Sequence, residues 1–297
     1  MPDEVTRIIG AETAAPCPSQ VLALAEAARA RHGPGIVAVL FYGSGLRDGA
    51  IGGKLADLYL VAESYRALGG SRLMRWLNRV LPPNVYYIAL PGDGPRIHAK
   101  YALVSLPHLE RLVSPATLNP YFWARFAQPT AIAWARDAAV RERLVGVLAE
   151  AARTMLRETV PLLPSTASGR EIWVQAFALT YRTELRAEPA SRGAELYRAS
   201  PERYDRIAAA VRAEPHALAA PLTAQRRWRR RRIAGKLLSV LRLVKAAFTF
   251  EDGADYLAWK IERHSGVRVE LGPWQRRHPV LASPALFWRL YRAGAFR

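Results

Sequence analysis

The sequence predicts an α/β protein in which a domain of alternating strands and helices is followed by a mainly helical section and a basic helical section. Three observations lead to this prediction. In the first part of the chain, apolar runs of strand length alternate with helical patterns. In the middle part the periodicity is helical only, and towards the end of the chain positive charge accumulates. We therefore divide the chain into residues 17–115, 116–220 and 221–297.

The elements of the first section have recognisable boundaries. A helix is expected over Ser19–Arg31, because its pattern stops at Gly33, Pro34 and Gly35. Ile36–Phe41 is a continuous apolar run, as in a central strand. The other elements expected here are strands at Leu55–Val61, Val85–Leu90 and Ile97–Ser105, and helices at Ser71–Val80 and Leu106–Leu112.

From Tyr121 onward the pattern is helical. It is clearest over Asp137–Val160, where apolar residues recur at the spacing of one helix face. Further helices are expected at Glu171–Tyr181, Pro201–Arg212 and Ile233–Phe248. The last of these follows a run of arginines, which marks the third section.

Composition excludes several classes of protein. With 51% hydrophobic and 23% charged residues the chain is neither disordered nor a disulfide scaffold, and Cys17 is its single cysteine. No apolar run reaches the roughly 18 to 20 residues that span a bilayer. Met1–Ala15 contains Asp3 and Glu4 and resembles neither a signal peptide nor a transit peptide. We expect a cytoplasmic protein that does not cross a membrane.

The net charge of +18 predicts anionic partners. Residues 225–297 carry 17 Lys and Arg against 5 Asp and Glu, so +12 of this charge lies in the third section. Arginines interleaved with aromatic residues are typical of contact with anionic lipid, and an RNA-binding role stays open although no nucleic-acid-binding motif is recognisable. A packed core helix would show the same apolar stripe over Ile233–Phe248. The candidate lipid-contacting residues are Arg226, Arg227, Trp228, Arg229, Lys236 and Lys245.

A Gly-Ser turn and a following carboxylate form the first candidate site. Gly43-Ser44-Gly45 ends the apolar strand, and Asp57 lies in the next predicted strand. Glycines let backbone N–H groups approach a phosphate closely, and an aspartate can hold a divalent cation against the same phosphate. An ordinary tight turn is the alternative for the Gly-Ser-Gly alone.

Lysine usage points to two further residues. The chain has 38 Arg but only 5 Lys, and before residue 225 the only lysines are Lys54 and Lys100. In a chain that otherwise uses arginine, a compact ammonium group is expected where a point charge must reach a phosphate.

Four blocks of sequence resemble the mitochondrial-type CDP-diacylglycerol synthases, which are phosphatidate cytidylyltransferases of the translocator assembly and maintenance family within the DNA polymerase beta-like nucleotidyltransferases. The blocks are Phe41-Tyr42-Gly43-Ser44-Gly45 with Lys54-Leu55-Ala56-Asp57-Leu58; Ile97–Ser105 continued by Tyr121–Pro129; Leu179–Arg186; and Lys245-Ala246-Ala247-Phe248-Thr249. They occur in the family's order. The sequence departs from the superfamily or family pattern at Tyr59, where a second carboxylate is usual in the superfamily, and at Ala102, Gln128 and Glu184.

The resemblance implies a nucleotidyltransferase-type mixed sheet, a winged-helix-like middle domain and a reaction of CTP with phosphatidic acid that yields CDP-diacylglycerol and pyrophosphate. It implies Mg²⁺ or Mn²⁺ as cofactor and an anionic membrane as partner, with a peripheral location on the inner face of a prokaryotic membrane. The residues implied are catalytic Asp57, Lys100 and Ser44; nucleotide-binding Gly43, Ser44, Lys54, Lys100, Tyr101 and Arg125; and metal-binding Asp57 and Glu184. A nucleotidyltransferase acting on RNA or another acceptor, and a non-catalytic membrane-binding relative, remain alternatives.

Overall fold

A computed structural model describes residues 3–47, 49, 55–91, 96–185, 189, 191–215, 219–249, 272 and 274–275. It confirms the α/β class. The strands are β1 (Ile36–Tyr42), β2 (Leu55–Ala62), β3 (Asn84–Leu90), β4 (Ile97–Ser105) and β5 (Thr130–Ala135). They form one open sheet in the order β3-β4-β2-β1-β5, in which β2 and β4 are parallel and the other neighbours are antiparallel. The sheet is therefore mixed.

The helices lie close to the ranges that periodicity predicts. Those before β5 are α1 (Glu4–Thr13), α2 (Ser19–His32), α3 (Ser44–Arg47), α4 (Arg72–Val80), α5 (Leu106–Val113) and α6 (Tyr121–Phe126). Those after β5 are α7 (Ala138–Thr159), α8 (Gly169–Tyr181), α9 (Arg192–Arg198), α10 (Pro201–Ala213) and α11 (Pro221–Thr249), with a 3₁₀ turn at Val160–Leu162.

Strand β5 differs from the sequence prediction, which treated the chain after Tyr121 as helical. Three of its six residues are alanines, which have low strand propensity, so the segment carries little local signal. Pairing with β1 nevertheless makes it an edge strand. The sheet thus extends past residue 115, and α1, which the sequence analysis did not predict, packs against α7 and α10.

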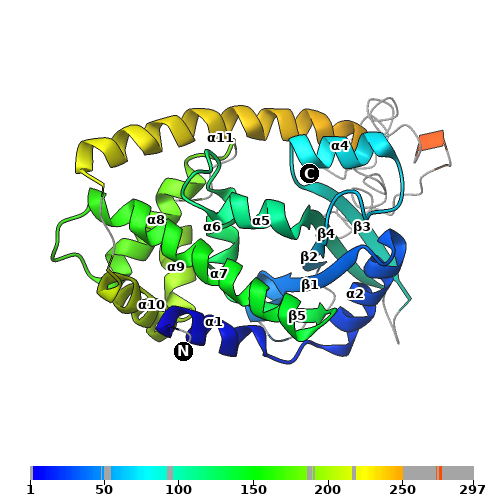
Figure 1. Ribbon diagram of the computed structural model, residues 1–297, viewed down its shortest axis with the longest axis horizontal. Helices are drawn as coiled ribbons and strands as arrows, with labels where there is room; N and C mark the ends of the chain where they lie inside the picture. The colour runs from blue at the N-terminus through cyan, green and yellow to red at the C-terminus, as the bar shows by residue number, and fades with distance from the viewer. Residues whose placement is uncertain are drawn as a thin grey trace, which may run out of the picture.

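The sheet has helices on both of its faces (Figure 1), and a hydrophobic core lies on each face. Helix α2 covers one face, and α1, α5, α6 and α7 cover the other. The second core continues from the sheet into α8 and α10, so the sheet and the helical section share it. Among the described residues from 136 to 249 every regular element is a helix, and none of them forms the strands of a wing.

Helix α11 crosses both parts of the molecule and is held at both ends (Figure 1). Near its start Trp228 is only 5% exposed and donates a hydrogen bond to the Glu158 carbonyl at 2.8 Å. Arg231 forms a buried ion pair with Glu158 at 2.6 Å. Near its end Lys245 donates to the Pro83 carbonyl at 2.8 Å, next to β3. The helix is therefore part of the folded structure over its whole described length.

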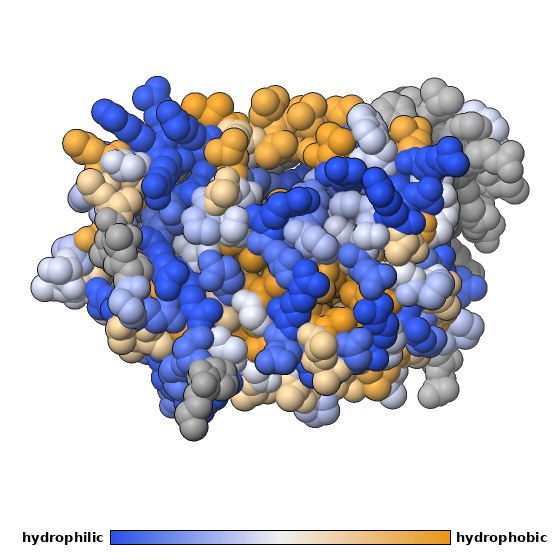
Figure 2. All heavy atoms as spheres, in the orientation of Figure 1, coloured by the Kyte–Doolittle hydropathy of each residue, from blue (hydrophilic) through white to orange (hydrophobic). Residues whose placement is uncertain are grey.

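The outer face of α11 is apolar and exposed to solvent. Ile233 is 62% exposed and Leu237 is 60% exposed, and the side chains of Val240, Leu241 and Val244 are exposed on the same side. Figure 2 shows this apolar band along the edge of the molecule formed by α11. The stripe predicted from the sequence is real, but it does not face the core. No helix in the described part of the chain is long and apolar enough to cross a membrane.

Candidate active site

Four side chains form a row across the sheet on one of its faces. Tyr42 of β1 pairs with Asp57 of β2, Asp57 pairs with Lys100 of β4, and Lys100 pairs with Tyr87 of β3. Directly paired residues point to the same face of a sheet. The row lies where β1 ends and where β2 begins, so the Gly-Ser turn that follows β1 lies beside it.

Gly43 leaves space for the Asp57 carboxylate. Its φ of +89° lies in the left-handed region, and a Cβ at this position would lie 2.8 Å from Asp57 Oδ2. A side chain here would therefore be strained and would also displace the carboxylate. Both effects explain why a glycine, and not only a turn, is required next to Asp57.

We expect Gly43→Ala to lower the nucleotidyltransferase activity that the resemblance implies about 100-fold, because a shift of about 1 Å in a catalytic group can cost that much. The strained backbone is expected to cost a further 1–2 kcal/mol or so of stability. Gly33→Ala is the matched control, since Gly33 has a φ of +80° but nothing within 4 Å of an added Cβ. It should lose stability and keep turnover. Turnover of folded Gly43→Ala within about threefold of wild type would contradict this account.

Asp57 lies in a cationic environment. Burial raises the pKa of its carboxyl, while Arg125, Lys100 and Arg47 act in the opposite direction. The charged carboxylate is thus poorly solvated but faces three positive groups. A carboxylate of this kind is suited to bind a metal cation, either alone or already held by a polyanion.

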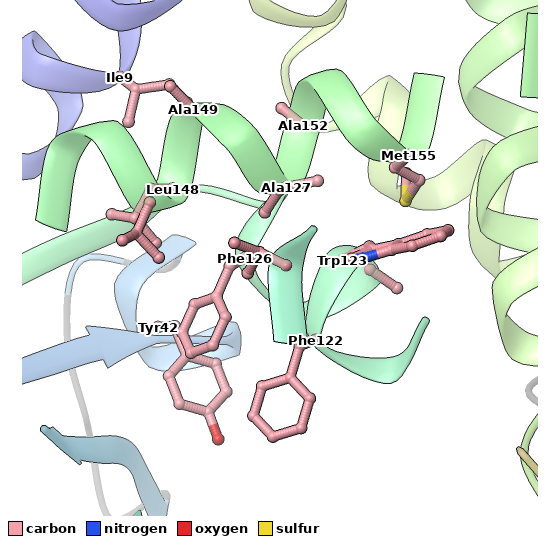
Figure 3. Close-up of a cluster of buried hydrophobic side chains, with 14 of the residues drawn as sticks. Ile9, Tyr42, Phe122, Trp123, Phe126, Ala127, Leu148, Ala149, Ala152 and Met155 are labelled. Carbon is pink, nitrogen blue, oxygen red and sulfur yellow. The ribbon is translucent and has the colours of Figure 1, made fainter. Parts of the chain in front are cut away.

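Arg125 brings a second positive charge to Asp57 from α6. Its guanidinium carbon lies 5.1 Å from the centre of the Tyr42 ring and 5.2 Å from the centre of the Tyr121 ring. One Nη donates to the Tyr121 hydroxyl at 3.3 Å, while Nε is buried and has no partner among the described residues. Figure 3 shows Tyr42 beside Phe122 and Phe126 of α6, which join the helix to the sheet.

The Tyr121 hydroxyl lies among several charged groups. Burial acts to raise its pKa, but Arg125, Tyr59 and Lys100 outweigh burial, so the pKa lies below its usual value. Glu184 acts on the same hydroxyl and on Arg242 of α11. The site therefore extends from Asp57 through Tyr121 to α11.

The residues present fit a divalent cation only with help from a substrate. Asp57 supplies one half-buried carboxylate, and Glu184 is electrostatically linked to Tyr121 rather than to Asp57. Within the described residues no group of three His, Cys, Asp or Glu side chains gathers to hold a metal. Mg²⁺ usually needs only one or two carboxylates when phosphate oxygens and water complete its shell, so Asp57 fits that type of site.

The structure brings together some of the predicted site residues and separates others. Gly43, Asp57, Lys100 and Arg125 converge, and Ser44 is exposed where α3 begins beside them. Tyr101 is fully buried on the opposite face of the sheet, where it is stacked on Tyr86 and bonded to His32 at 3.1 Å. It therefore does not reach the site. Lys54 lies outside the described residues.

The predicted lipid-contacting residues also divide into two groups. Arg226, Arg227, Arg229 and Lys236 are exposed on α11, although Arg227 also pairs with Glu158 at 3.2 Å. Trp228 and Lys245 are buried in contacts within the protein. These two side chains hold the helix in place and do not face outward.

Sequence reasoning missed the tyrosines of the site. Tyr42 and Tyr87 extend the row on both sides of Asp57 and Lys100, and the Tyr87 hydroxyl is bonded to His98 Nδ1. Tyr121 belongs to the site as well, although the sequence analysis names it only as the first residue of the block Tyr121–Pro129. The period of two along a strand already places residues 98, 100 and 102 on one face, but strand order was needed to reveal Tyr87.

No family model matches the sequence, and the comparison with curated proteins finds no significant match.

Proposed function

We propose that the protein is a metal-dependent phosphatidate cytidylyltransferase, which makes CDP-diacylglycerol and pyrophosphate from CTP and phosphatidic acid. The observation that carries the proposal is the convergence of Gly43, Asp57, Lys100 and Arg125 at one edge of the sheet. A glycine turn, one carboxylate and two cations are the groups that phosphoryl-group transfer requires.

This reaction depends on the positioning of the two substrates more than on proton transfer. A phosphate oxygen of the lipid attacks the α-phosphorus of CTP, the bond from that phosphorus to the bridging oxygen breaks, and pyrophosphate leaves. The attacking phosphomonoester is already ionised at neutral pH, so no strong base is needed. Lys100 and Arg125 would neutralise charge on the phosphates, and Gly43 would let the backbone approach them.

Mg²⁺ or Mn²⁺ would supply charge neutralisation at the reacting phosphate when bound. Asp57 is the residue that would hold it, together with the phosphates of CTP. Glu184 remains a proposed second ligand, although the described groups on which its charge acts are Tyr121 and Arg242.

The outer surface supports a lipid as the acceptor. The apolar face of α11 is joined by α4, where Leu73 and Trp76 are 59% and 57% exposed and Val80 is exposed one turn further on. These three residues share one helix face, and Figure 1 shows α4 beside the end of α11. Exposed apolar residues next to Arg226, Arg229 and Lys236 are typical of proteins that bind an anionic lipid surface.

The proposal includes a peripheral position on the inner face of a prokaryotic membrane and the three-part organisation of the chain, whereas the described helices after β5 lend no support to a winged-helix-like middle domain. These finer assignments rest on the resemblance.

RNA is the second candidate acceptor because the start of α11 presents a basic surface. Arg226, Arg227, Arg229, Arg230 and Arg232 are all exposed. Such a surface neutralises the phosphates of any polyanion, and its binding would depend strongly on salt.

An acceptor screen separates these candidates. The full chain is incubated with Mg²⁺, each of the four α-labelled nucleoside triphosphates, and either phosphatidic acid vesicles or RNA. The proposal predicts label in lipid and only from CTP. Label in RNA would replace it with the second candidate, and no label under any condition would favour a non-catalytic relative.

The apolar face of α11 gives a separate prediction. Leu237→Glu should weaken binding to phosphatidic acid vesicles about tenfold or more, since burying one leucine contributes about 1.5–3 kcal/mol. Leu22→Glu is the matched control, because Leu22 is 45% exposed on α2 at the other side of the sheet. Vesicle sedimentation measures both. Equal binding of Leu237→Glu and wild type would show that this face does not contact lipid.

A further inference from the structure

Two arginines from different helices approach the same tyrosine ring. Arg125 of α6 places its guanidinium carbon 5.2 Å from the centre of the Tyr121 ring, and Arg242 of α11 places its own 5.5 Å from that centre. Arg242 is only partly exposed, and burial lowers the pKa of its guanidinium. Two cations thus contact the same tyrosine ring, although they are 117 positions apart in the sequence.

Neither guanidinium makes an ion pair within 4.0 Å with a described residue, although Asp57 acts on Arg125 and Glu184 acts on Arg242 over a longer distance. Arg242 makes one hydrogen bond to the described part of the chain, from Nε to the Pro82 carbonyl at 2.8 Å, and both of its Nη atoms remain available. Arg125 bonds only the Tyr121 hydroxyl, and its Nε is buried without an acceptor. Cations withdrawn from water in this way are costly unless an anion joins them.

We propose that Arg125 and Arg242 bind the phosphate of the acceptor, a phosphomonoester carried by a lipid. This inference rests on the proposed function and names a site for its second substrate. A guanidinium offers N–H groups in a planar fork that matches phosphate oxygens, so a pair of them can orient a phosphomonoester. Because Arg125 also acts on Asp57, a phosphate held here lies next to the groups that would hold CTP.

The position of Arg242 on α11 favours a lipid over a soluble phosphate. Val240 and Val244 are exposed on the outer face of the helix, whereas Arg242 points to the inner side and bonds Pro82. A helix with its side chains is about 10 Å across. The phosphate of a lipid that rests on the outer face of α11 therefore lies only about that far from the inner side, where Arg242 is. One helix would therefore contact the membrane outward and the acceptor phosphate inward.

Calorimetric titration of the full chain with monomeric dihexanoyl phosphatidic acid tests this site without requiring turnover. A non-reactive α,β-methylene analogue of CTP and Mg²⁺ are present throughout. Arg242→Ala should weaken lipid binding about 10- to 100-fold, the range expected for a lost charge-assisted hydrogen bond. Arg242→Lys should recover part of it, and binding of the CTP analogue should change less than about threefold. Arg198→Ala, exposed on α9, is the control.

Three results would overturn the proposal. The first is that the wild-type chain fails to bind the lipid, and the second is that Arg242→Ala binds the lipid as tightly as wild type does. The third is that binding of RNA oligonucleotides, but not of the lipid, depends on Arg242. If Arg242→Ala does not fold, Arg242→Gln gives the same test, since its amide can still donate to Pro82. Arg242-dependent lipid binding without any transfer from CTP would leave the site standing and remove the proposed function.

Discussion

Asp57→Asn is expected to reduce cytidylyl transfer about 1,000-fold or more while the fold is retained. Asp57 is the one described carboxylate that lies among Gly43, Lys100 and Arg125, so its loss removes both the proposed metal ligand and the negative charge that those cations face. Removing a single preorganised group at a reacting phosphate or carbonyl commonly costs 100- to 1,000-fold or so, and a metal ligand lies at the upper end.

The same substitution should not destabilise the protein at neutral pH. Burial raises the pKa of Asp57, so above its usual pKa the charged form is less favourable in the folded chain than in the unfolded one. An uncharged amide avoids that penalty. Initial rates and thermal unfolding measure the two effects, with Glu63→Gln as control because Glu63 is exposed and pairs with Arg136. Turnover near wild type at saturating Mg²⁺ would refute the role of Asp57.

Lys100→Ala is expected to lower kcat/KM for CTP about 10- to 100-fold, which corresponds to the loss of a hydrogen bond to a charged group worth about 1.5–3 kcal/mol. Lys100 is paired in register with Asp57, so its ammonium group is near any phosphate bound there. Lys100→Arg should keep part of the activity because the charge remains.

Arg66→Ala removes one positive charge from an exposed position and controls for the change in net charge. Its kcat/KM should stay within about twofold of wild type. If Lys100→Ala binds CTP and turns over as well as Arg66→Ala does, Lys100 has no role at the site.

Local patterns predicted most elements of the fold because those patterns are carried by the elements themselves. Strand β4 occupies the predicted range Ile97–Ser105, and α7 lies within one residue of its expected limits at each end. Strand β5 could not be predicted this way, since its alanines give weak strand signal and its pairing with β1 supplies the missing stability. Sheet order is a tertiary property that no local pattern contains.

The site was predictable only in part for the same reason. Gly43 and Asp57 were recognisable because Gly43 lies in the turn after one predicted strand and Asp57 lies in the next predicted strand. Alternation along β4 sends Lys100 and Tyr101 to opposite faces, so a role for both in one site was inconsistent with a strand. Arg242 carries no signal of its own, because its place beside Tyr121 depends on how α11 docks on the Pro82 segment.

The position of the transferred phosphorus tests the central claim most directly. The full chain, Mg²⁺ and phosphatidic acid vesicles are incubated in parallel with CTP labelled at the α-phosphate and with CTP labelled at the γ-phosphate. The account predicts that the α label enters the lipid as CDP-diacylglycerol, that the γ label appears only in pyrophosphate, and that Asp57→Asn gives neither. Transfer of the γ label to the lipid, or of the α label to RNA and not to lipid, would contradict it.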